Sequence, residues 1–409
     1  MSFPELEVLN SHVSRIFHVD DVTAGDPRQW LVRYRGHFLS EDTVAAYDQL
    51  ADAVNPYGIT PLFRKEGDTQ VIYLAATPVV PKSSARVTVN IVLFVLTVIS
   101  MMVTLVDVPA NMTFTSEMSY YIYKFQHIIS GWPFALSMMG ILFAHEMGHY
   151  IACRIYKIPA TLPFFIPAPL ISPLGTFGAF IAMRGIPKNK RILFDVGVAG
   201  PIAGLVIAVP VLFIGLSLSH LGVIDQPPPG MQGVLEGNSL FYLFAKYMVF
   251  GKLLPDPVNY GGLSPVLYWI RYFLTGQPVP FGGTDVMVHQ VAWAGWGGLL
   301  VTALNLVPVG TLDGGHVVYG LFGEKARKIF PIAIGVLIAL MILPVVLTLS
   351  FTSFNFSWLL WVFILFWLGN VRTQPLDDIT PLDVKRRVLG YVMLLVFILI
   401  FTPIPMVGY

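Results

Sequence analysis

The sequence predicts a polytopic α-helical membrane protein with about seven transmembrane helices, a re-entrant β-hairpin segment and a small N-terminal α+β domain. Three observations predict this fold class. Hydrophobic residues make up 55% of the 409-residue chain and charged residues only 12%, whereas soluble proteins average about 25% charged residues. Several apolar stretches approach the length needed to cross a bilayer. Residues 1–84, by contrast, are mostly polar and of mixed charge.

The N-terminal region, residues 1–84, is predicted to be a soluble domain on the cytosolic side. Cap and turn residues delimit its expected elements: a helix at 5–17, a strand at 30–38, a helix at 40–53, and strands at 58–63 and 70–75. The β-α-β-β order of the last four favours a compact open-faced sheet. Such a domain suits regulation or the binding of a partner.

Apolar spans follow at 87–106, 132–153, 192–216, 288–308, 329–350, 354–370 and 388–403. Lysine and arginine are concentrated in loops on one side of these spans, at 82–86, 154–157, 184–191, 325–328 and 372–387. The positive-inside rule predicts that this side, together with the N-terminus, is cytosolic. We therefore expect a multi-pass protein in contact with the lipid bilayer. Its net charge of +1 argues against a nucleic-acid partner.

The segment 158–184 does not fit a simple membrane crossing. It contains five prolines and almost no charge, so a continuous helix is not expected. Backbone groups at membrane depth need protein or a wet cavity as partners. We interpret the segment as a re-entrant loop with a β-hairpin around 175–178, whose free edge could pair with an unfolded peptide. An irregular plug without a substrate role is the alternative. Two aromatic stretches, 241–250 and 267–274, are expected to lie on the membrane surface.

The motif with the clearest chemical meaning is HEMGH at 145–149, inside the span 132–153. His145 and His149 stand at i and i+4 of a helix, so they project from one face and can bind one metal ion together. Glu146 is placed to accept a proton from a water molecule at that metal. Ionisable groups are costly to insert into a membrane span, and this cost favours a functional role for all three residues.

A catalytic zinc site needs three protein ligands and an open position, so a third ligand is expected at a similar depth. Asp313 is the candidate, because it follows the span 288–308 where Pro308 and nearby glycines end the helix. The alternative is an ordinary Asp-Gly turn at the membrane boundary. Cys153 is the single cysteine, which excludes a cysteine-built zinc site. His316 is interpreted as a boundary residue, with a hydrogen-bond partner of Asp313 as the alternative.

Three motifs resemble the site-2 protease family of intramembrane zinc metalloproteases. They are HEMGH, the small-residue stretch GPIAG at 200–204, and the pattern N-x-x-P-x-x-x-x-D-G at 305–314. The proline-rich segment looks closest to the branch of the family that lacks an inserted PDZ domain. The resemblance implies a Zn²⁺ cofactor, with the following roles: His145, His149 and Asp313 as ligands, Glu146 as general base, and Asn305 as a residue that helps to hold substrate or the oxyanion.

The apolar spans predict how the chain is divided, and the resemblance, which covers about 130–320, implies what it acts on. Residues 85–130 would hold the first transmembrane helix and an outer loop, 131–322 the intramembrane metalloprotease core, and 323–409 the C-terminal transmembrane helices. The implied activity is the hydrolysis of peptide bonds within or next to transmembrane segments, in regulated intramembrane proteolysis. The expected substrates are membrane-anchored proteins such as transcription regulators or anti-sigma factor precursors, and the expected location is the plasma membrane of a prokaryote.

Two other functions would use the same His/Asp cluster. A membrane metal transporter could bind its cargo there, but transporters usually contain inverted repeats and the sequence shows no internal repeat. A metal-binding pseudoprotease would typically lack one ligand or the glutamate, whereas all four residues are present. The glutamate between the two histidines therefore favours hydrolysis.

Overall fold

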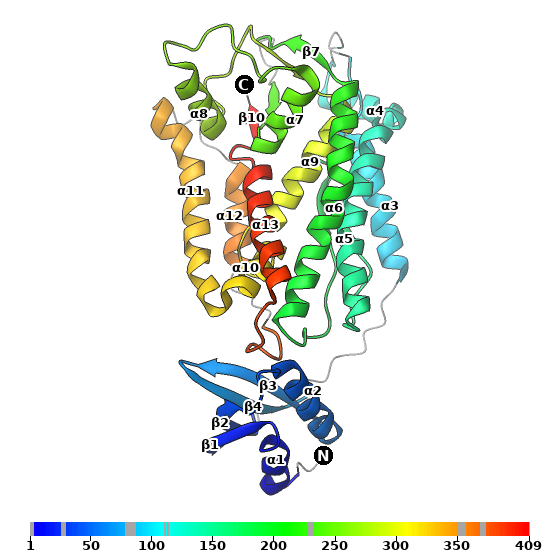
Figure 1. The fold of residues 1–409 in the computed structure, drawn as a ribbon. Helices are drawn as coiled ribbons and strands as arrows, with labels where there is room; N and C mark the ends of the chain where they lie inside the picture. Colours follow the sequence, from blue (N-terminus) through cyan, green and yellow to red (C-terminus); the bar gives the residue numbers. More distant parts are fainter. Residues whose placement is uncertain are drawn as a thin grey trace.

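The structure is a computed structural model that describes residues 4–25, 30–77, 87–109, 112, 114–169, 171–227, 233–349, 357–368 and 374–408. The basic positions at 82–86 and 372, which contributed to the predicted orientation, lie outside these residues. A bundle of long helices forms the body of the molecule, and the N-terminal domain lies beyond one end of it (Figure 1).

The N-terminal domain is a four-stranded antiparallel sheet with two helices. Its elements are α1 (Leu6–Val13), β1 (Phe17–Ala24), β2 (Val32–Phe38), α2 (Thr43–Val54), β3 (Ile59–Glu66) and β4 (Thr69–Ala76), and the strand order is β1-β2-β4-β3. The expected helix at 5–17 is too long, because α1 ends at Val13 and β1 is an additional strand. A register shift between Val19 and Asp21 interrupts β1. This bulge breaks the alternation by which a strand is predicted from sequence.

Each predicted membrane span contains a helix in the structure. These helices are α3 (Val87–Thr104), α5 (Trp132–Ile155), α6 (Lys190–Leu218), α9 (Gln290–Asn305), α11 (Ile329–Thr348), α12 (Ser357–Leu368) and α13 (Val384–Ile400). Among the described residues, four stretches are long and apolar enough to cross a membrane: 87–104, 128–155, 190–218 and 313–347. The last of them contains α10 (Asp313–Phe322) as well as α11. The chain is therefore a polytopic helical membrane protein.

Three helices, α5, α6 and α9, form the centre of the bundle. Large apolar side chains such as Phe134, Met138, Leu212 and Trp296 are almost completely buried between them. Gly295 allows α9 to approach α6 closely, since a Cβ atom there would lie 2.5 Å from the Cα atom of Leu212. In lipid the hydrophobic effect does not drive helices together, so their association depends on close packing. Small residues at the crossings allow this close approach.

The proline-rich segment forms a hairpin of β5 (Phe164–Pro167) and β6 (Thr176–Phe180). The hairpin was expected around 175–178, and residues 176–178 lie at the start of its second strand. Polar side chains of α3 hold the hairpin: Asn90 donates to the carbonyl oxygens of Leu162 and Pro163, and Ser100 donates to that of Gly175. These three carbonyl groups lie outside any helix, and side chains of α3 provide their hydrogen-bond partners.

The end of the bundle opposite the N-terminal domain carries short elements (Figure 1). They are α4 (Glu117–Gln126), β7 (His220–Val223), β8 (Val234–Glu236), α7 (Leu240–Phe250), α8 (Pro265–Thr275), β9 (Thr284–Met287) and β10 (Met406–Gly408). The chain end returns here, because β10 pairs with β8. The predicted aromatic stretches 241–250 and 267–274 coincide with α7 and α8.

One short segment, 376–378, joins the N-terminal domain to the helical bundle. On one side it pairs with β3, through hydrogen bonds from Phe63 N to Leu376 O and from Asp378 N to Phe63 O, both 3.0 Å. On the other side it bonds to the chain just before α6, from Asp377 N to Lys188 O at 2.8 Å. A continuous ladder of backbone hydrogen bonds therefore runs from the N-terminal sheet to the start of α6.

Candidate metal centre

The two histidines of the motif HEMGH lie one turn apart in α5 and point toward α6 and α9. His145 is 3% exposed and His149 is 7% exposed. Their Nε2 atoms are 3.2 Å apart, and the two ring planes are inclined at 70°. The i and i+4 spacing on a regular helix produces this convergence without any distortion of the backbone.

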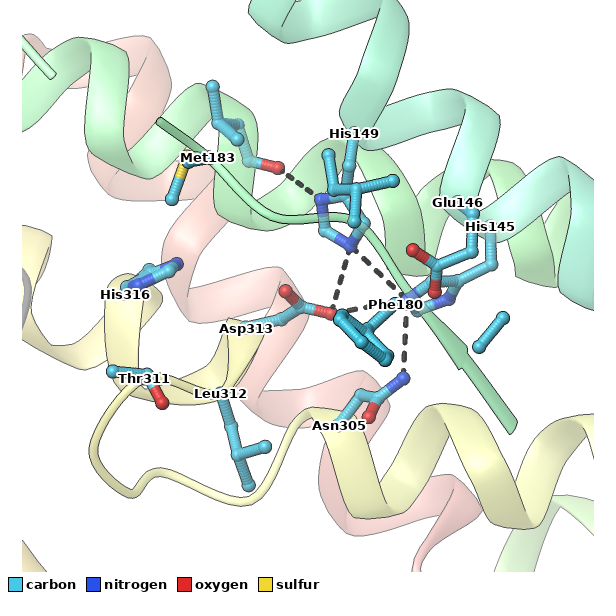
Figure 2. A pocket seen from close by; sticks show the side chains of 13 residues that line it. His145, Glu146, His149, Phe180, Met183, Asn305, Thr311, Leu312, Asp313 and His316 are labelled. Carbon is cyan, nitrogen blue, oxygen red and sulfur yellow. Dashed lines mark hydrogen bonds and ion pairs between the residues drawn. The ribbon is translucent and has the colours of Figure 1, made fainter. Parts of the chain in front are cut away.

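Asp313 reaches the same point from the first residue of α10 (Figure 2). The loop between α9 and α10 folds tightly, and Gly310 has a φ of 55°, a conformation that favours glycine. The two residues after Asp313 are also glycines for a steric reason. A Cβ atom at Gly314 would lie 2.0 Å from the carbonyl oxygen of Leu306. The Asp-Gly-Gly sequence is therefore part of the packing that brings this carboxylate to the histidines.

The three ligand atoms form an equilateral triangle. Asp313 Oδ2 lies 3.2 Å from His145 Nε2 and 3.2 Å from His149 Nε2, the same distance that separates the two nitrogens. Zinc–ligand bonds of about 2.0 Å in a tetrahedral site place neighbouring ligand atoms about 3.3 Å apart. The triangle thus has the size of one face of such a site. Among the described residues it is the one group of this kind that could hold a metal ion.

The ring of His149 is oriented by a backbone carbonyl group on α6. Its Nδ1 atom is 2.8 Å from the oxygen of Val196, so the proton is placed on Nδ1 and the Nε2 lone pair points to the triangle. The carbonyl of an ordinary helical residue gives no signal in the sequence. Val196 is therefore a contributor that sequence reasoning could not identify.

Glycines of α6 form the surface against which the imidazole rings pack. The atoms nearest to Gly200 and Gly204 are histidine atoms. An added Cβ would lie 3.1 Å from His145 Nδ1 at Gly204, and 2.0 Å from His149 Nε2 at Gly200. The small-residue motif therefore makes room for the metal-binding rings themselves.

The ligand triangle borders a cavity of about 170 Å³. Glu146 lines it and is 4% exposed. Asn305, at the end of α9, also lines it, with Nδ2 3.2 Å from His145 Nε2. The wall opposite is the end of the hairpin, residues 179–181 and Met183. All five residues named by the sequence analysis, His145, Glu146, His149, Asn305 and Asp313, thus meet at one cavity (Figure 2).

His316 is a sixth polar residue of this cavity, and the structure does not place it at a solvated boundary. It is 6% exposed, and neither ring nitrogen has a hydrogen-bond partner among the described residues, Asp313 included. The ring packs on Gly197 of α6, where an added Cβ would lie 2.7 Å from the Cβ of His316. Three histidines therefore follow one another along the same face of α6.

Comparison with known proteins identifies relatives of the chain. Residues 133–349, more than half of the chain, match the model of peptidase family M50. The chain is 29% identical over 273 residues to a protein named probable zinc metalloprotease EGY1, chloroplastic, from Arabidopsis thaliana, and 30% identical over 278 residues to the protein of that name from Oryza sativa. It is 29% identical over 276 residues to the Arabidopsis protein EGY2, also named a probable zinc metalloprotease.

These alignments cover 66%, 68% and 67% of this chain, but only 43%, 41% and 42% of the relatives. The chain thus spans less than half the length of the proteins that it matches. All three are named as chloroplast proteins, which gives no support to the expected prokaryotic plasma membrane. No solved structure matched the chain significantly.

Proposed function

Because the chain belongs to peptidase family M50, the family of the site-2 proteases, we propose that it is an intramembrane zinc metalloprotease. The observation that carries the proposal is the buried triangle of His145, His149 and Asp313, whose 3.2 Å edges fit a zinc ion. Two imidazole nitrogens and one carboxylate oxygen are a donor set that catalytic zinc uses, with the remaining position open. The relatives named as zinc metalloproteases support the choice of metal.

The residues around the triangle divide the chemistry among them. Bound Zn²⁺ supplies Lewis acidity, which activates water and polarises the scissile carbonyl. Glu146 borders the cavity, where its carboxylate accepts the proton of the attacking water and passes it to the leaving amine. The amide nitrogen of Asn305 lies 3.2 Å from His145 Nε2 and can donate to the oxygen that gains charge during the attack. A transporter would not need a carboxylate at the position of Glu146.

We further propose that the hairpin binds the substrate as an added strand. In the described part of the chain β6 pairs only with β5, and residues 179–181 at its end line the metal cavity. A peptide bond in a transmembrane helix has its carbonyl group engaged in the helix, so cleavage requires local unwinding. The released backbone groups need new partners at membrane depth, and a free strand edge offers them. In this proposal the hairpin is re-entrant.

The arrangement in the membrane follows from the same proposal. Seven crossings, by α3, α5, α6, α9, α11, α12 and α13, put the N-terminal domain on the cytosolic side and the metal cavity near that side. Residues 1–84 act as a separate domain, 131–322 as the protease core and 323–409 as the C-terminal helices. The substrates are membrane-anchored proteins, with transcription regulators or anti-sigma factor precursors as the class to test first.

The decisive experiment compares the full chain with its Glu146→Gln variant, purified in detergent or nanodiscs. Cleavage of a model transmembrane substrate is measured together with the zinc content of each protein. We expect about one zinc per chain in both proteins and cleavage by the wild type alone, because Glu146 does not belong to the ligand triangle. His145→Ala serves as the matched variant on the same helix and should lose both the metal and the activity.

Each alternative gives a different result. Zinc bound without cleavage, together with zinc movement across vesicle membranes that requires Asp313, would favour a transporter. Wild-type protein that retains no zinc after purification would contradict the proposal at its base. Equal cleavage by the Glu146→Gln variant would remove the general-base role while leaving the metal site intact.

A further inference from the structure

His316 is the titratable group of the metal cavity to which the proposed chemistry gives no role. It is buried, it lines the cavity, and both of its ring nitrogens lack a hydrogen-bond partner among the described residues. Leaving a buried donor or acceptor unpaired is costly, which is why such groups in folded proteins almost always have a partner. A partner that enters the cavity would remove this cost.

The position of the ring separates it from the other polar groups. In Figure 2 the carboxylate of Asp313 lies between His316 on one side and Glu146 and Asn305 on the other. Gly197 fixes the ring against α6, since its missing Cβ leaves space for that of His316. The ring is thus held on a rigid helix, at the end of the cavity away from the general base.

The nearest strand-like wall of the cavity gives the direction of a bound peptide. Four residues of this part of the chain border the cavity: Ala179, Phe180, Ile181 and Met183. A peptide paired with this edge would extend past the metal ligands toward both Asn305 and His316. The groups of an unwound segment that need partners are backbone N–H and C=O groups.

From this geometry we infer that His316 is a substrate-binding residue, which hydrogen-bonds the backbone of the unwound peptide segment on the side of the metal away from Asn305. The inference rests on the proposed function and deepens it. His316 would act on substrate binding. It would add nothing to the metal ligands or to proton transfer from the attacking water.

This role makes a prediction that a structural role does not. The substitution His316→Phe keeps the ring volume and removes two buried polar atoms without partners, so the folded protein should keep or gain thermal stability. If His316 only supported the fold or the metal site, the same substitution would lower the thermal stability or the zinc content. His316→Gln retains a hydrogen-bonding side chain and should restore part of the lost function.

The test measures substrate binding apart from cleavage. A fluorescently labelled leucine-rich transmembrane peptide with a central Asn-Gly break is titrated into the full-length Glu146→Gln protein in nanodiscs, with and without His316→Phe. We expect Kd to rise about 5- to 10-fold, which corresponds to the loss of one or two neutral hydrogen bonds. The zinc content should be unchanged, and the melting temperature should be unchanged or higher. In the otherwise wild-type chain, KM for cleavage should rise more than kcat falls. His220→Phe, an exposed histidine outside the cavity, is the control.

Three results would overturn the inference: an unchanged Kd, a loss of zinc, or a fall in melting temperature that matches the loss of binding. Equal loss in the Phe and Gln variants would also count against a hydrogen bond. Failure of the proposed function itself looks different, because the wild type would then cleave nothing and the Glu146→Gln protein would not bind the peptide.

Discussion

Gly200 lies directly against the imidazole ring of His149: a Cβ atom at position 200 would be 2.0 Å from Nε2, the ring atom that faces Asp313. The contact joins the small-residue motif of α6 to the metal-binding motif of α5. It means that the position of a ligand depends on the absence of a methyl group on another helix. Helix packing and metal binding are therefore one geometric requirement here.

The substitution Gly200→Ala should displace His149 and weaken metal binding. Because the ring is buried between two helices, it cannot move away without breaking the hydrogen bond to Val196. Disturbing such a support typically costs about 10- to 100-fold in metal affinity. Competition for zinc with a calibrated chelator measures the effect.

A matched control for this substitution exists on α5. Gly140 also lies in a membrane helix, but an added Cβ there meets nothing within 4 Å. The substitution Gly140→Ala should therefore leave zinc affinity unchanged and raise stability slightly, since alanine favours helix by up to about 1 kcal/mol. Equal zinc affinity in both variants would contradict the steric account of Gly200.

Asn305→Leu should slow the chemical step while zinc remains bound. The amide Nδ2 is 3.2 Å from His145 Nε2, so it borders the ligand triangle without belonging to it. Loss of one donor to a developing oxyanion costs about 10²- to 10³-fold in kcat. Single-turnover cleavage and zinc analysis on the same sample separate the two effects. Loss of zinc in this variant would instead assign Asn305 to support of His145.

The junction between the N-terminal domain and α10 can be tested at Tyr319. Tyr319 lies on α10, the helix that begins with Asp313. Its hydroxyl donates a hydrogen bond to the carboxylate of Asp378 at 2.8 Å. The substitution Tyr319→Phe should weaken the docking of segment 376–378. The carboxylate of Asp378 then keeps its ion pair with Lys190 but loses the hydrogen bond from the hydroxyl. Hydrogen exchange should increase at 376–378 and at β3. Unchanged exchange at β3 would show that this contact does not hold the domain in place.

The end of the bundle opposite the N-terminal domain should respond to pH through Glu236. Burial, reinforced by the charge of Asp285 and opposed by Lys246, raises the pKa of Glu236 from 4.5 to about 7. An acid whose pKa is higher in the folded state holds its proton more tightly when folded. Its contribution to stability is therefore complete below about pH 4.5 and is lost as the pH rises through 7.

Glu236→Gln should flatten this dependence, and thermal unfolding in detergent between pH 5 and 8 measures it. The side-chain oxygen that accepts from the Tyr242 hydroxyl at 2.9 Å is kept in the variant. Lys246→Met is the opposing control: Lys246 is 0% exposed and 3.3 Å from Asp285, so its loss leaves two buried carboxylates without a cation. That variant should be strongly destabilised, by about 3–5 kcal/mol. A pH profile that is the same in the wild type and in Glu236→Gln would exclude Glu236 as the titrating group.

Local patterns in the sequence were sufficient for the positions of the helices and for the metal motif. Long apolar runs specify helices because only internal hydrogen bonding satisfies the backbone in lipid. HEMGH specifies two ligands on one face because helical geometry fixes the spacing of i and i+4. These inferences need no knowledge of neighbouring helices. The strand β1 was not predicted, because its bulge interrupts the alternation on which such a local inference depends.

Only the tertiary structure decided how distant parts meet. Asp313 completes the triangle because α10 packs against α6. The role of the glycines at 197, 200 and 204 depends on which side chains face them. The role of the Val196 carbonyl, the burial of His316 and the docking of segment 376–378 depend on contacts between segments far apart in the chain. The sequence determined by itself what can be read within one helix or one span, because those forces act between near neighbours. The three-dimensional packing decided everything that depends on distances between elements.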